Sequence, residues 1–340
     1  MSHNKRVLIT GGAGFVGSNL ISYLLKRYPH YKVINFDKLT ESGALNRLHA
    51  EENNPNYLFV NGDITSERDV QYVFEEYKPD FIVHFASQSY IDRNIHQPGI
   101  FIQTNVIGTQ NLLLNARSTQ VGKMVHISTS KVYGCTKFGM GKEDEETPMK
   151  PCDPYAASKA SADLFVQAAY RAHNLDVNII RPTNIYGKYQ FPEKLIPTVI
   201  GAIMQDKEIP VFGDGHNVRD WVFIDDYCQA IDLVLHRGQA GETYNLSSGD
   251  ELRNIELVKK IMIMMKGDKT RINFMKDRLG DQSYPSIEAK KITTELGWKP
   301  QTEIDEGLKK TIEWYKNHTD WIEEIYSGDY QRYNDEIQKS

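Results

Sequence analysis

Short apolar runs alternate with longer amphipathic stretches through the first half of the chain. This alternation is typical of βαβ units around a parallel sheet. The runs are rich in Val, Ile and Phe and are bounded by Gly, Pro, Asn or Asp, as expected for buried strands. The predicted strands are Arg6–Thr10, Lys32–Phe36, Tyr57–Val60, Asp80–Phe85 and Lys123–Ser128.

Apolar residues between these runs recur at helical spacing, which predicts crossover helices. The pattern therefore predicts an α/β fold, a Rossmann-type doubly wound parallel sheet with a smaller C-terminal α/β substrate lobe. After about residue 190, prolines and glycines separate shorter elements, as expected for such a lobe. The residues with helical spacing are Phe15, Leu20, Leu24, Leu25, Val106, Leu112 and Leu113.

The composition narrows the possible partners. The chain has 340 residues, 40% hydrophobic and 25% charged, which is an ordinary globular balance. Its net charge of −5 provides no basic face for nucleic acid. No apolar run reaches about 18 residues and the N-terminus lacks a signal-peptide core, so neither a membrane nor export is expected.

The three cysteines match neither a disulfide framework nor a zinc pattern. Cys135, Cys152 and Cys228 are interpreted as small packing residues in a reducing compartment, although the first two flank the candidate active site. We therefore predict a cytoplasmic protein without a bound metal.

A glycine-rich turn joins the first predicted strand to the first helix. Gly11 permits a tight turn, Gly14 lets backbone N–H groups approach a ligand, and Gly17 allows close packing of the helix. Such a turn alone is weak evidence, but Asp37 follows at the end of the second strand. A carboxylate there accepts hydrogen bonds from the ribose of NAD and repels the 2′-phosphate of NADP, so NAD is the expected cofactor.

A Tyr-x-x-x-Lys pair follows later, at Tyr155 and Lys159. Residues four apart share one face of a helix. The ammonium of Lys159 is expected to stabilise a phenolate at Tyr155 and to lower its pKa from about 10, which would make it a base for a sugar hydroxyl. Because the pair follows a dinucleotide motif, we favour this reading over a solvated helix face.

Together these motifs resemble the extended short-chain dehydrogenases/reductases. The resemblance implies that Tyr155 accepts a proton from the hydroxyl on sugar carbon 4 while NAD takes a hydride from that carbon, and that Thr129 steadies the oxygen. The resulting 4-keto group acidifies carbon 5. The further cofactor-binding residues that it implies are Phe15, Val16, Lys38, Asp63, Ile64, Phe85, Ala86, Ser87 and Asn105.

Over nearly its whole length the chain is similar to the dTDP-glucose 4,6-dehydratases. Segments 33–40, 92–93, 104–109, 189–197, 213–215, 217–221 and 277–280 carry the resemblance. It implies cations and amides that hold a nucleotide diphosphate. The substrate-binding residues expected from it are Ser89, Tyr90, Asp92, Arg93, Asn184, Lys194, Leu195, Asn217, Arg219 and Arg278.

The chain departs from that family where the family carries its acid and base. The family has Thr-Asp-Glu before Val-Tyr-Gly, whereas this chain has Thr129, Ser130 and Lys131. A serine is a poor acid for a departing 6-hydroxyl. Lys131 resembles the carbon-5 lysine of inverting UDP-GlcNAc 4,6-dehydratases, and it would act there if burial lowered its pKa. Residues 88–90 and 280–285 also depart from the family, which implies a different sugar or base.

The leading hypothesis is an NAD-dependent enzyme that oxidises carbon 4 of a UDP- or dTDP-sugar and acts at carbon 5, giving an epimerised or 4-keto-6-deoxy product. One form of it takes a 5,6-unsaturated UDP-sugar. The alternatives are a 4,6-dehydratase with a substituted acid and base, a nucleotide-sugar 4-epimerase, a regulator that binds NAD(H) or a nucleotide-sugar, and a drifted paralogue.

The expected domains are an NAD-binding domain at 1–190, mainly substrate lobe at 191–320 with segments that return to the first domain, and a polar tail at 321–340. The tail is expected to form a surface helix or an oligomer contact. Related enzymes imply a homodimer through the two long mid-domain helices.

Overall fold

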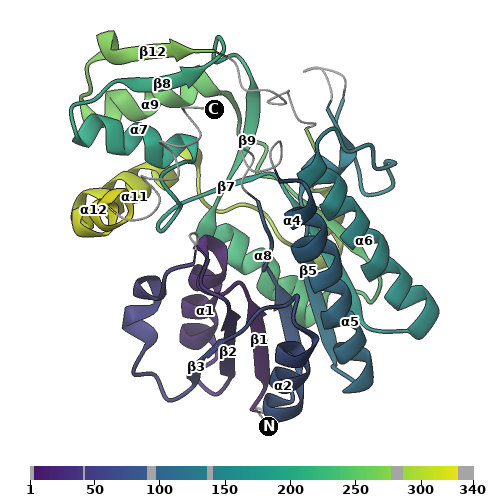
Figure 1. Ribbon diagram of the computed structural model, residues 1–340. Helices are drawn as coiled ribbons and strands as arrows, with labels where there is room; N and C mark the ends of the chain where they lie inside the picture. The colour runs from purple at the N-terminus through teal and green to yellow at the C-terminus, as the bar shows by residue number, and fades with distance from the viewer. Residues whose placement is uncertain (1–3, 41–42, 90–96, 136–140, 277–285, 328–340) are drawn as a thin grey trace.

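The computed structural model describes residues 4–40, 43–89, 97–135, 141–276 and 286–327 (Figure 1). At its centre lies a seven-stranded sheet in which each strand runs parallel to its neighbours. Its order, β10-β6-β5-β4-β1-β2-β3, is that of a doubly wound dinucleotide-binding sheet with one strand added. The strands are β1 Arg6–Thr10, β2 Lys32–Asp37, β3 Tyr57–Asn61, β4 Phe81–His84, β5 Lys123–Ile127, β6 Val177–Pro182 and β10 Thr243–Leu246.

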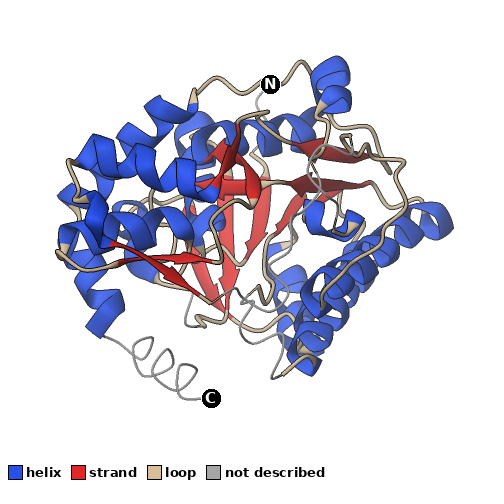
Figure 2. Cartoon of the chain, turned by 90° about the horizontal axis from the view of Figure 1, so that it is seen from above, coloured by secondary structure: helices blue, strands red, loops and turns tan. Residues whose placement is uncertain are grey.

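Helices cover both faces of this sheet (Figure 2). One face packs on α1 (Phe15–Arg27) and α8 (Ile224–Arg237), and the other on α2 (Glu67–Tyr77), α5 (Gly108–Ser118) and α6 (Pro154–His173). The side chains of each strand alternate between the two cores, as period-two geometry requires. In β1, for example, Val7 and Ile9 enter the core with α1, whereas Leu8 enters the other.

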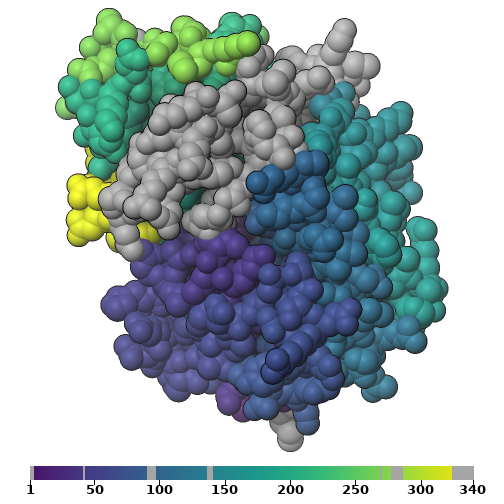
Figure 3. All heavy atoms as spheres, viewed as in Figure 1, coloured from purple at the N-terminus to yellow at the C-terminus, as the bar shows by residue number. Residues whose placement is uncertain are grey.

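The second half of the chain builds a smaller lobe at the carboxyl ends of the sheet strands (Figures 1 and 3). It has a three-stranded sheet of order β11-β9-β7 and the pair β12-β8. The strands are β7 Asn184–Tyr186, β8 Ile209–Phe212, β9 Val218–Phe223, β11 Glu251–Arg253 and β12 Ile272–Met275. The helices of this half other than α8 are α7 Leu195–Met204, α9 Asn254–Met265, α10 Lys290–Leu296, α11 Ile304–Asn317 and α12 Thr319–Ser327.

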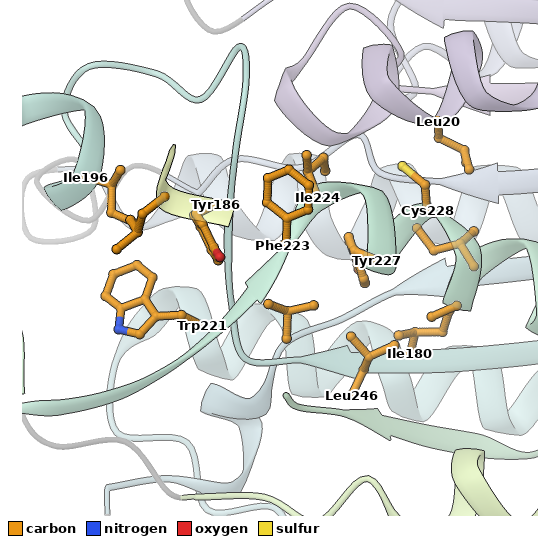
Figure 4. Close-up of a cluster of buried hydrophobic side chains, with 14 of the residues drawn as sticks. Leu20, Ile180, Tyr186, Ile196, Trp221, Phe223, Ile224, Tyr227, Cys228 and Leu246 are labelled. Carbon is orange, nitrogen blue, oxygen red and sulfur yellow. The ribbon is translucent and has the colours of Figure 1, made fainter. Parts of the chain in front are cut away.

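One continuous apolar core joins the lobe to the large sheet. Figure 4 shows Ile196 and Trp221 of the lobe at one end, and Leu20, Ile180 and Cys228 at the other. Because α8 begins directly after β9, the lobe and the α1 face of the sheet share the same packed side chains. The lobe is therefore held firmly above the strand ends.

The structure confirms the predicted fold class, and each of the five predicted strands is present within one residue of its expected ends. The sequence pattern missed β6 and β10, which complete the large sheet. Since β10 pairs with β6, the chain after residue 190 contributes to both sheets. The boundaries at 190 and 320 stay predictions.

Two helical segments differ from expectation. The helix expected around Val106 contains a π-helical stretch, η2 (Ile102–Ile107), between α4 (Gly99–Phe101) and α5. The expected polar tail at 321–340 overlaps α12. In this helix the side chains of Trp321 and Ile322 are buried in the core. These apolar side chains outweigh the polar composition around them. The short helical turns are η1 Leu45–Glu51, η3 Ser130–Tyr133 and η4 Lys269–Arg271.

Candidate active site

The glycine-rich turn lies between β1 and α1, where its backbone is tightly enclosed. Gly11 has a φ of +71°, in the left-handed region that favours glycine. A Cβ there would lie 2.7 Å from the backbone nitrogen of Ala86, and a Cβ at Gly17 would lie 2.4 Å from the carbonyl oxygen of Gly11. Neither position admits a side chain without a shift, so the turn keeps the bare backbone that a pyrophosphate requires.

The first turn of α1 faces this backbone. Gly14 precedes the helix, and Phe15 and Val16 begin it. The turn carries no acidic residue, so the partial positive charge of the helix end is not neutralised locally. These features fit the diphosphate of a dinucleotide.

Asp37 ends β2 beside the turn. Its carboxylate accepts hydrogen bonds from the backbone N–H groups of Ala13 (3.0 Å) and Leu39 (2.8 Å). Burial raises the pKa of Asp37, and these hydrogen bonds and the charge of Arg47 only partly offset the rise. The carboxylate is thus fixed in direction at the position where a ribose is expected.

The next predicted cofactor residues lie at the same edge of the sheet. Lys38 forms an ion pair with Asp63 at 3.0 Å, with both side chains about one-third exposed. Ile64 is buried, and its carbonyl oxygen accepts a hydrogen bond from Asn111. The three residues therefore link the ends of β2 and β3 to α5.

Phe85, Ala86 and Ser87 follow β4, opposite the glycine-rich turn. The backbone nitrogens of Phe85 and Ala86 donate to the carbonyl oxygen of Thr10 at 3.0 and 3.1 Å. This places them at the crevice between β1 and β4, where the strand order reverses. Doubly wound sheets bind their ligands at that crevice.

Asn105 lies on η2 and is buried. Its amide oxygen accepts from the backbone N–H of Gln88 (2.8 Å), and its amide nitrogen donates to Gln88 O (3.0 Å) and to Ser158 Oγ (2.8 Å). Asn105 thus ties the segment after β4 to α6. A direct contact between Asn105 and a cofactor stays a prediction.

Tyr155 and Lys159 lie at the start of α6. Asp153 caps this helix by accepting from the backbone N–H of Ala156, and a proline occupies the first turn, where its missing N–H costs nothing. The Tyr155 ring packs edge-on against Phe101 at 6.2 Å between centroids. The ammonium of Lys159 donates to the carbonyl oxygen of Ile127 at 2.6 Å, at the end of β5.

The pKa of Tyr155 differs from expectation. Burial raises it, and the carboxylates of Asp153 and Asp163 act in the same direction. Burial also lowers the pKa of Lys159 to about 8, although Asp163 opposes this. The expected lowering is thus not found at Tyr155 in this arrangement, because burial of the phenol and the two carboxylates all raise its pKa.

The turn η3 and the residue before it place Thr129, Ser130 and Lys131 near Tyr155. Thr129 caps the turn, since its hydroxyl accepts from the backbone N–H of Lys131 at 3.3 Å. Ser130 is buried. The Nζ atom of Lys131 lies 6.0 Å from the centroid of the Tyr155 ring. The structure thus places Lys131 near the ring of the candidate base.

The predicted nucleotide-binding residues are distributed over the lobe. Asn184 begins β7 and pairs in register with Trp221 of β9, two residues beyond Arg219. Lys194 precedes α7, which begins at Leu195, and its ammonium contacts Glu193 at 2.6 Å. The remaining described residues of the set are Asn217, just before β9, and Ser89, which is exposed. Tyr90, Asp92, Arg93 and Arg278 lie outside the described residues.

Sequence reasoning missed a buried polar chain that supports η3. Asp163 accepts from Arg181 Nε at 2.9 Å, Arg181 donates to the hydroxyl of Tyr133 at 2.9 Å, and Tyr133 donates to Asn245 at 2.6 Å. Tyr133 ends η3, so β6 and β10 anchor the turn that carries Lys131. The sequence offers little signal for it, because Arg181 is recognised as a buried strand residue that requires a partner only once β6 is in place.

The described residues also bear on metal binding and on membrane spanning. Among the residues that the structure describes, no group of three or more His, Cys, Asp or Glu side chains could hold a metal ion. Within the same residues, no helix is long and apolar enough to cross a membrane.

The strand order, the glycine turn at the crevice, the acidic residue after β2 and the Tyr-x-x-x-Lys helix define a short-chain dehydrogenase/reductase of the extended kind. Comparison with known proteins narrows this class. The family described as GDP-mannose 4,6 dehydratase matches residues 8–311. The dTDP-glucose 4,6-dehydratase of Streptomyces niveus is 42% identical over 328 residues, covering 95% of this chain and 96% of its own.

Solved structures agree. The dTDP-glucose 4,6-dehydratase of Bacillus anthracis in complex with NAD is 40% identical, covers 94% of this chain and 99% of its own, and has a TM-score of 0.88. The enzyme of the same name from Streptomyces venezuelae, also with NAD bound, is 41% identical with the same coverage and a TM-score of 0.90. The chain therefore belongs to the nucleotide-sugar 4,6-dehydratase family.

Proposed function

We propose that the protein is an NAD-dependent nucleotide-sugar enzyme that oxidises sugar carbon 4 and uses Lys131 as the acid and base at carbon 5. The observation that carries the proposal is the distance of 6.0 Å between Lys131 Nζ and the Tyr155 ring. Carbons 4 and 5 are bonded to each other, so a group that acts on carbon 5 must lie within a few ångströms of the base for the carbon-4 hydroxyl.

The cofactor-binding part of the proposal rests on the turn after β1 and on Asp37. NAD held there would accept the hydride from carbon 4 and return it later in the cycle. The enclosed backbone at Gly11 binds the diphosphate, and the fixed carboxylate of Asp37 selects the unphosphorylated ribose.

Tyr155 removes the proton of the carbon-4 hydroxyl, and Thr129 hydrogen-bonds the same oxygen. Lys159 stabilises the phenolate that forms. The ketone at carbon 4 makes the hydrogen on carbon 5 acidic, and Lys131 takes or delivers a proton at that carbon. Ser130, buried next to Lys131, replaces the family's acid and leaves no strong donor for a departing 6-hydroxyl at that position.

A 5,6-unsaturated UDP-sugar fits this set of residues well. Its 6-hydroxyl is already absent, so no acid is required there. Oxidation of carbon 4, hydride return to carbon 6 and protonation of carbon 5 by Lys131 convert it to a 4-keto-6-deoxy isomer, and no atom is gained or lost overall. Carbon 5 of this substrate is trigonal, so delivery of the proton from the Lys131 side would set the configuration opposite to that of the parent hexose.

The test is to incubate the protein with NAD and separately with dTDP-glucose, UDP-GlcNAc and a 5,6-unsaturated UDP-sugar, and to follow carbons 4, 5 and 6 by NMR. The proposal expects a 4-keto product with a changed carbon 5 from a UDP- or dTDP-sugar. If none of the three is converted, and Tyr155→Phe binds NAD and nucleotide-sugar as the parent does, a binding protein replaces the proposed enzyme.

A second candidate is an ordinary dTDP-glucose 4,6-dehydratase with a substituted acid and base. The observation in its favour is 42% identity to such an enzyme over almost the whole chain. The variant that carries both Ser130→Asp and Lys131→Glu distinguishes the two candidate functions. Under our proposal it gains dehydration of dTDP-glucose by at least about tenfold. A parent that is already fully active on dTDP-glucose favours the second candidate.

We also propose a homodimer through α5 and α6. These neighbouring helices expose Leu114, Leu164 and Phe165, with exposed fractions of 52%, 56% and 44%, beside a shallow groove lined in part by Leu113 and Ala169. Leu164→Asp should shift the mass measured by light scattering from two chains to one, whereas an aspartate at the exposed Leu58, on the far edge of the sheet, should not. A cytoplasmic location stays a prediction.

A further inference from the structure

Two cysteines that are far apart in the sequence lie together at the rim of the candidate active site. Cys135 follows η3 and Cys152 precedes α6. The backbone N–H of Lys150 donates to the carbonyl oxygen of Val132 at 2.9 Å, so the two segments run side by side. They are packed closely, because a Cβ on Gly134 would lie 2.2 Å from the carbonyl oxygen of Lys150.

The two thiols lie near each other. Both cysteines are reduced, and Cys152 is close enough to Cys135 to help raise the pKa of its thiol. Cys152 is exposed to solvent and its thiol points back along its own segment, donating to the carbonyl oxygen of Lys150 at 3.7 Å. Cys135 is only partly exposed. Cys152 is therefore the more accessible of the two thiols to a small oxidant.

We propose that Cys135 and Cys152 are an oxidation site that a peroxide converts to an intrachain disulfide, which ties the Lys131 turn to the Tyr155 helix. A disulfide needs the two sulfur atoms about 2.05 Å apart. Because the backbones of the two segments are hydrogen-bonded between Lys150 and Val132, rotations of the two side chains and a small backbone shift are the movements that this bond requires. The cross-link would join the two segments that carry the proposed carbon-4 base and the proposed carbon-5 lysine.

The chemistry balances with a peroxide as the oxidant. Cys152, the exposed thiol, is oxidised to a sulfenic acid while the peroxide O–O bond breaks and one water leaves. The sulfur of Cys135 then attacks the Cys152 sulfur and releases a second water. Two thiols lose two hydrogens and two electrons, and the peroxide is reduced to two waters.

The local electrostatics assign the order of these steps. Burial raises the pKa of Cys135 to about 12, and the neighbouring Cys152 and Asp153 add to the rise, while Lys131 opposes it. Cys135 is thus a poor first nucleophile and suits the second, resolving position. Ring closure should accelerate as the pH rises, since more of the Cys135 thiolate is then present.

The consequence for turnover rests on the proposed function. Lys131 lies four residues before Cys135, and Tyr155 lies three residues after Cys152. A covalent tie between the segments changes the approach of the ammonium to the ring, and a displacement of 1 Å at a reacting group costs on the order of 100-fold in rate. We expect turnover to fall at least tenfold on oxidation and to return with dithiothreitol.

The test treats the reduced protein with hydrogen peroxide and counts free thiols in denaturant, together with the intact mass and a non-reducing gel. The expected result is a fall from three thiols to one, a loss of two mass units, and migration as a single chain. Cys135→Ser and Cys152→Ser should form no intrachain disulfide and keep their turnover after a dithiothreitol rinse. Cys228→Ala, which removes the buried third cysteine, should still lose two thiols.

Three retained thiols after treatment, or disulfides that link separate chains, would overturn the proposal. So would a disulfide that still forms within Cys152→Ser. Because the thiol count does not depend on turnover, it tests the cysteine pair even if the proposed reaction is wrong. A complete disulfide with unchanged turnover would overturn only the coupling to the active site.

Discussion

The two sides of Tyr155 are built in different ways. On the cofactor side, the predicted ligand-binding positions are backbone turns at the ends of adjacent parallel strands, such as the turn at Gly11 and the segment after β4. On the sugar side, the predicted positions are side chains on η3, β7, β9 and the start of α7. The first side is determined by the fold and identifies a class, whereas the second depends on individual residues and determines the reaction.

The largest expected effect comes from the residue that both sides share. Tyr155→Phe removes the proposed base but keeps the ring that packs on Phe101. Turnover should fall by roughly 1,000-fold, within the range for loss of a general base. Steady-state kinetics with the converted nucleotide-sugar measure this effect. Tyr170→Phe, at the other end of α6, should stay within about twofold, and an equal loss in both variants would contradict the assignment.

A change on the sugar side alone should separate the two sides. Lys131→Met keeps the length of the side chain and removes its ammonium, so exchange of the hydrogen on carbon 5 should slow by roughly 100-fold. NAD affinity should not change, because the proposed role of Lys131 is at carbon 5 of the sugar and not at the cofactor. NMR in heavy water and calorimetric titration with NAD measure the two quantities. Lys150→Met is the matched control, and if it slowed exchange equally, Lys131 would have no special role.

A change on the cofactor side alone should weaken NAD binding. Asp37→Asn keeps the shape of the side chain and removes its charge, so NAD should bind roughly 10-fold to 100-fold more weakly, as expected for a hydrogen bond to a charged group. Discrimination against NADP should also decrease. Calorimetric titration with both cofactors measures this. Asp305→Asn, at an exposed aspartate on α11, is the matched control and should leave NAD affinity unchanged. Unchanged NAD affinity in Asp37→Asn would show that the ribose contact lies elsewhere.

The pH profile of turnover should have an alkaline limb that is set by the titration of Lys159. Burial lowers its pKa to about 8, and the two buried histidines nearby, His84 and His126, are kept neutral because burial lowers their pKa well below 6.5. As the pH rises through about 8, the ammonium is lost and turnover should decrease. Lys159→Arg retains its charge over this range, so its profile should lack the limb even if its rate is lower. The same alkaline limb in the arginine variant would assign it to another group.

The sequence predicted the cofactor side well because its signals are local. The glycine spacing, the strand ends and Asp37 follow one another within 27 residues, and backbone geometry dictates each of them. The sequence predicted less of the support for η3. Asp163, Arg181 and Asn245 meet only after β6 and β10 join the sheet, and no local pattern indicates that contact.

The same reason explains the wrong pKa expectation at Tyr155. Spacing alone placed Lys159 one helical turn away and suggested that its charge would dominate. Burial of the phenol depends on side chains from elsewhere in the chain, and it raises the pKa together with Asp153, which caps the same helix, and Asp163, which lies within it. Spacing therefore predicted which groups meet but not the balance of desolvation and charge between them.

The most direct test of the central claim is the stereochemistry at carbon 5. The purified protein is incubated in heavy water with dTDP-glucose, UDP-GlcNAc and a 5,6-unsaturated UDP-sugar, and the configuration and deuterium content of carbon 5 are read by NMR. If Lys131 acts at carbon 5, the product of the accepted sugar should carry one deuterium at carbon 5, in the configuration opposite to that of the parent hexose. Loss of the 6-hydroxyl from dTDP-glucose with retention at carbon 5 would contradict this role of Lys131 and show an ordinary dehydratase.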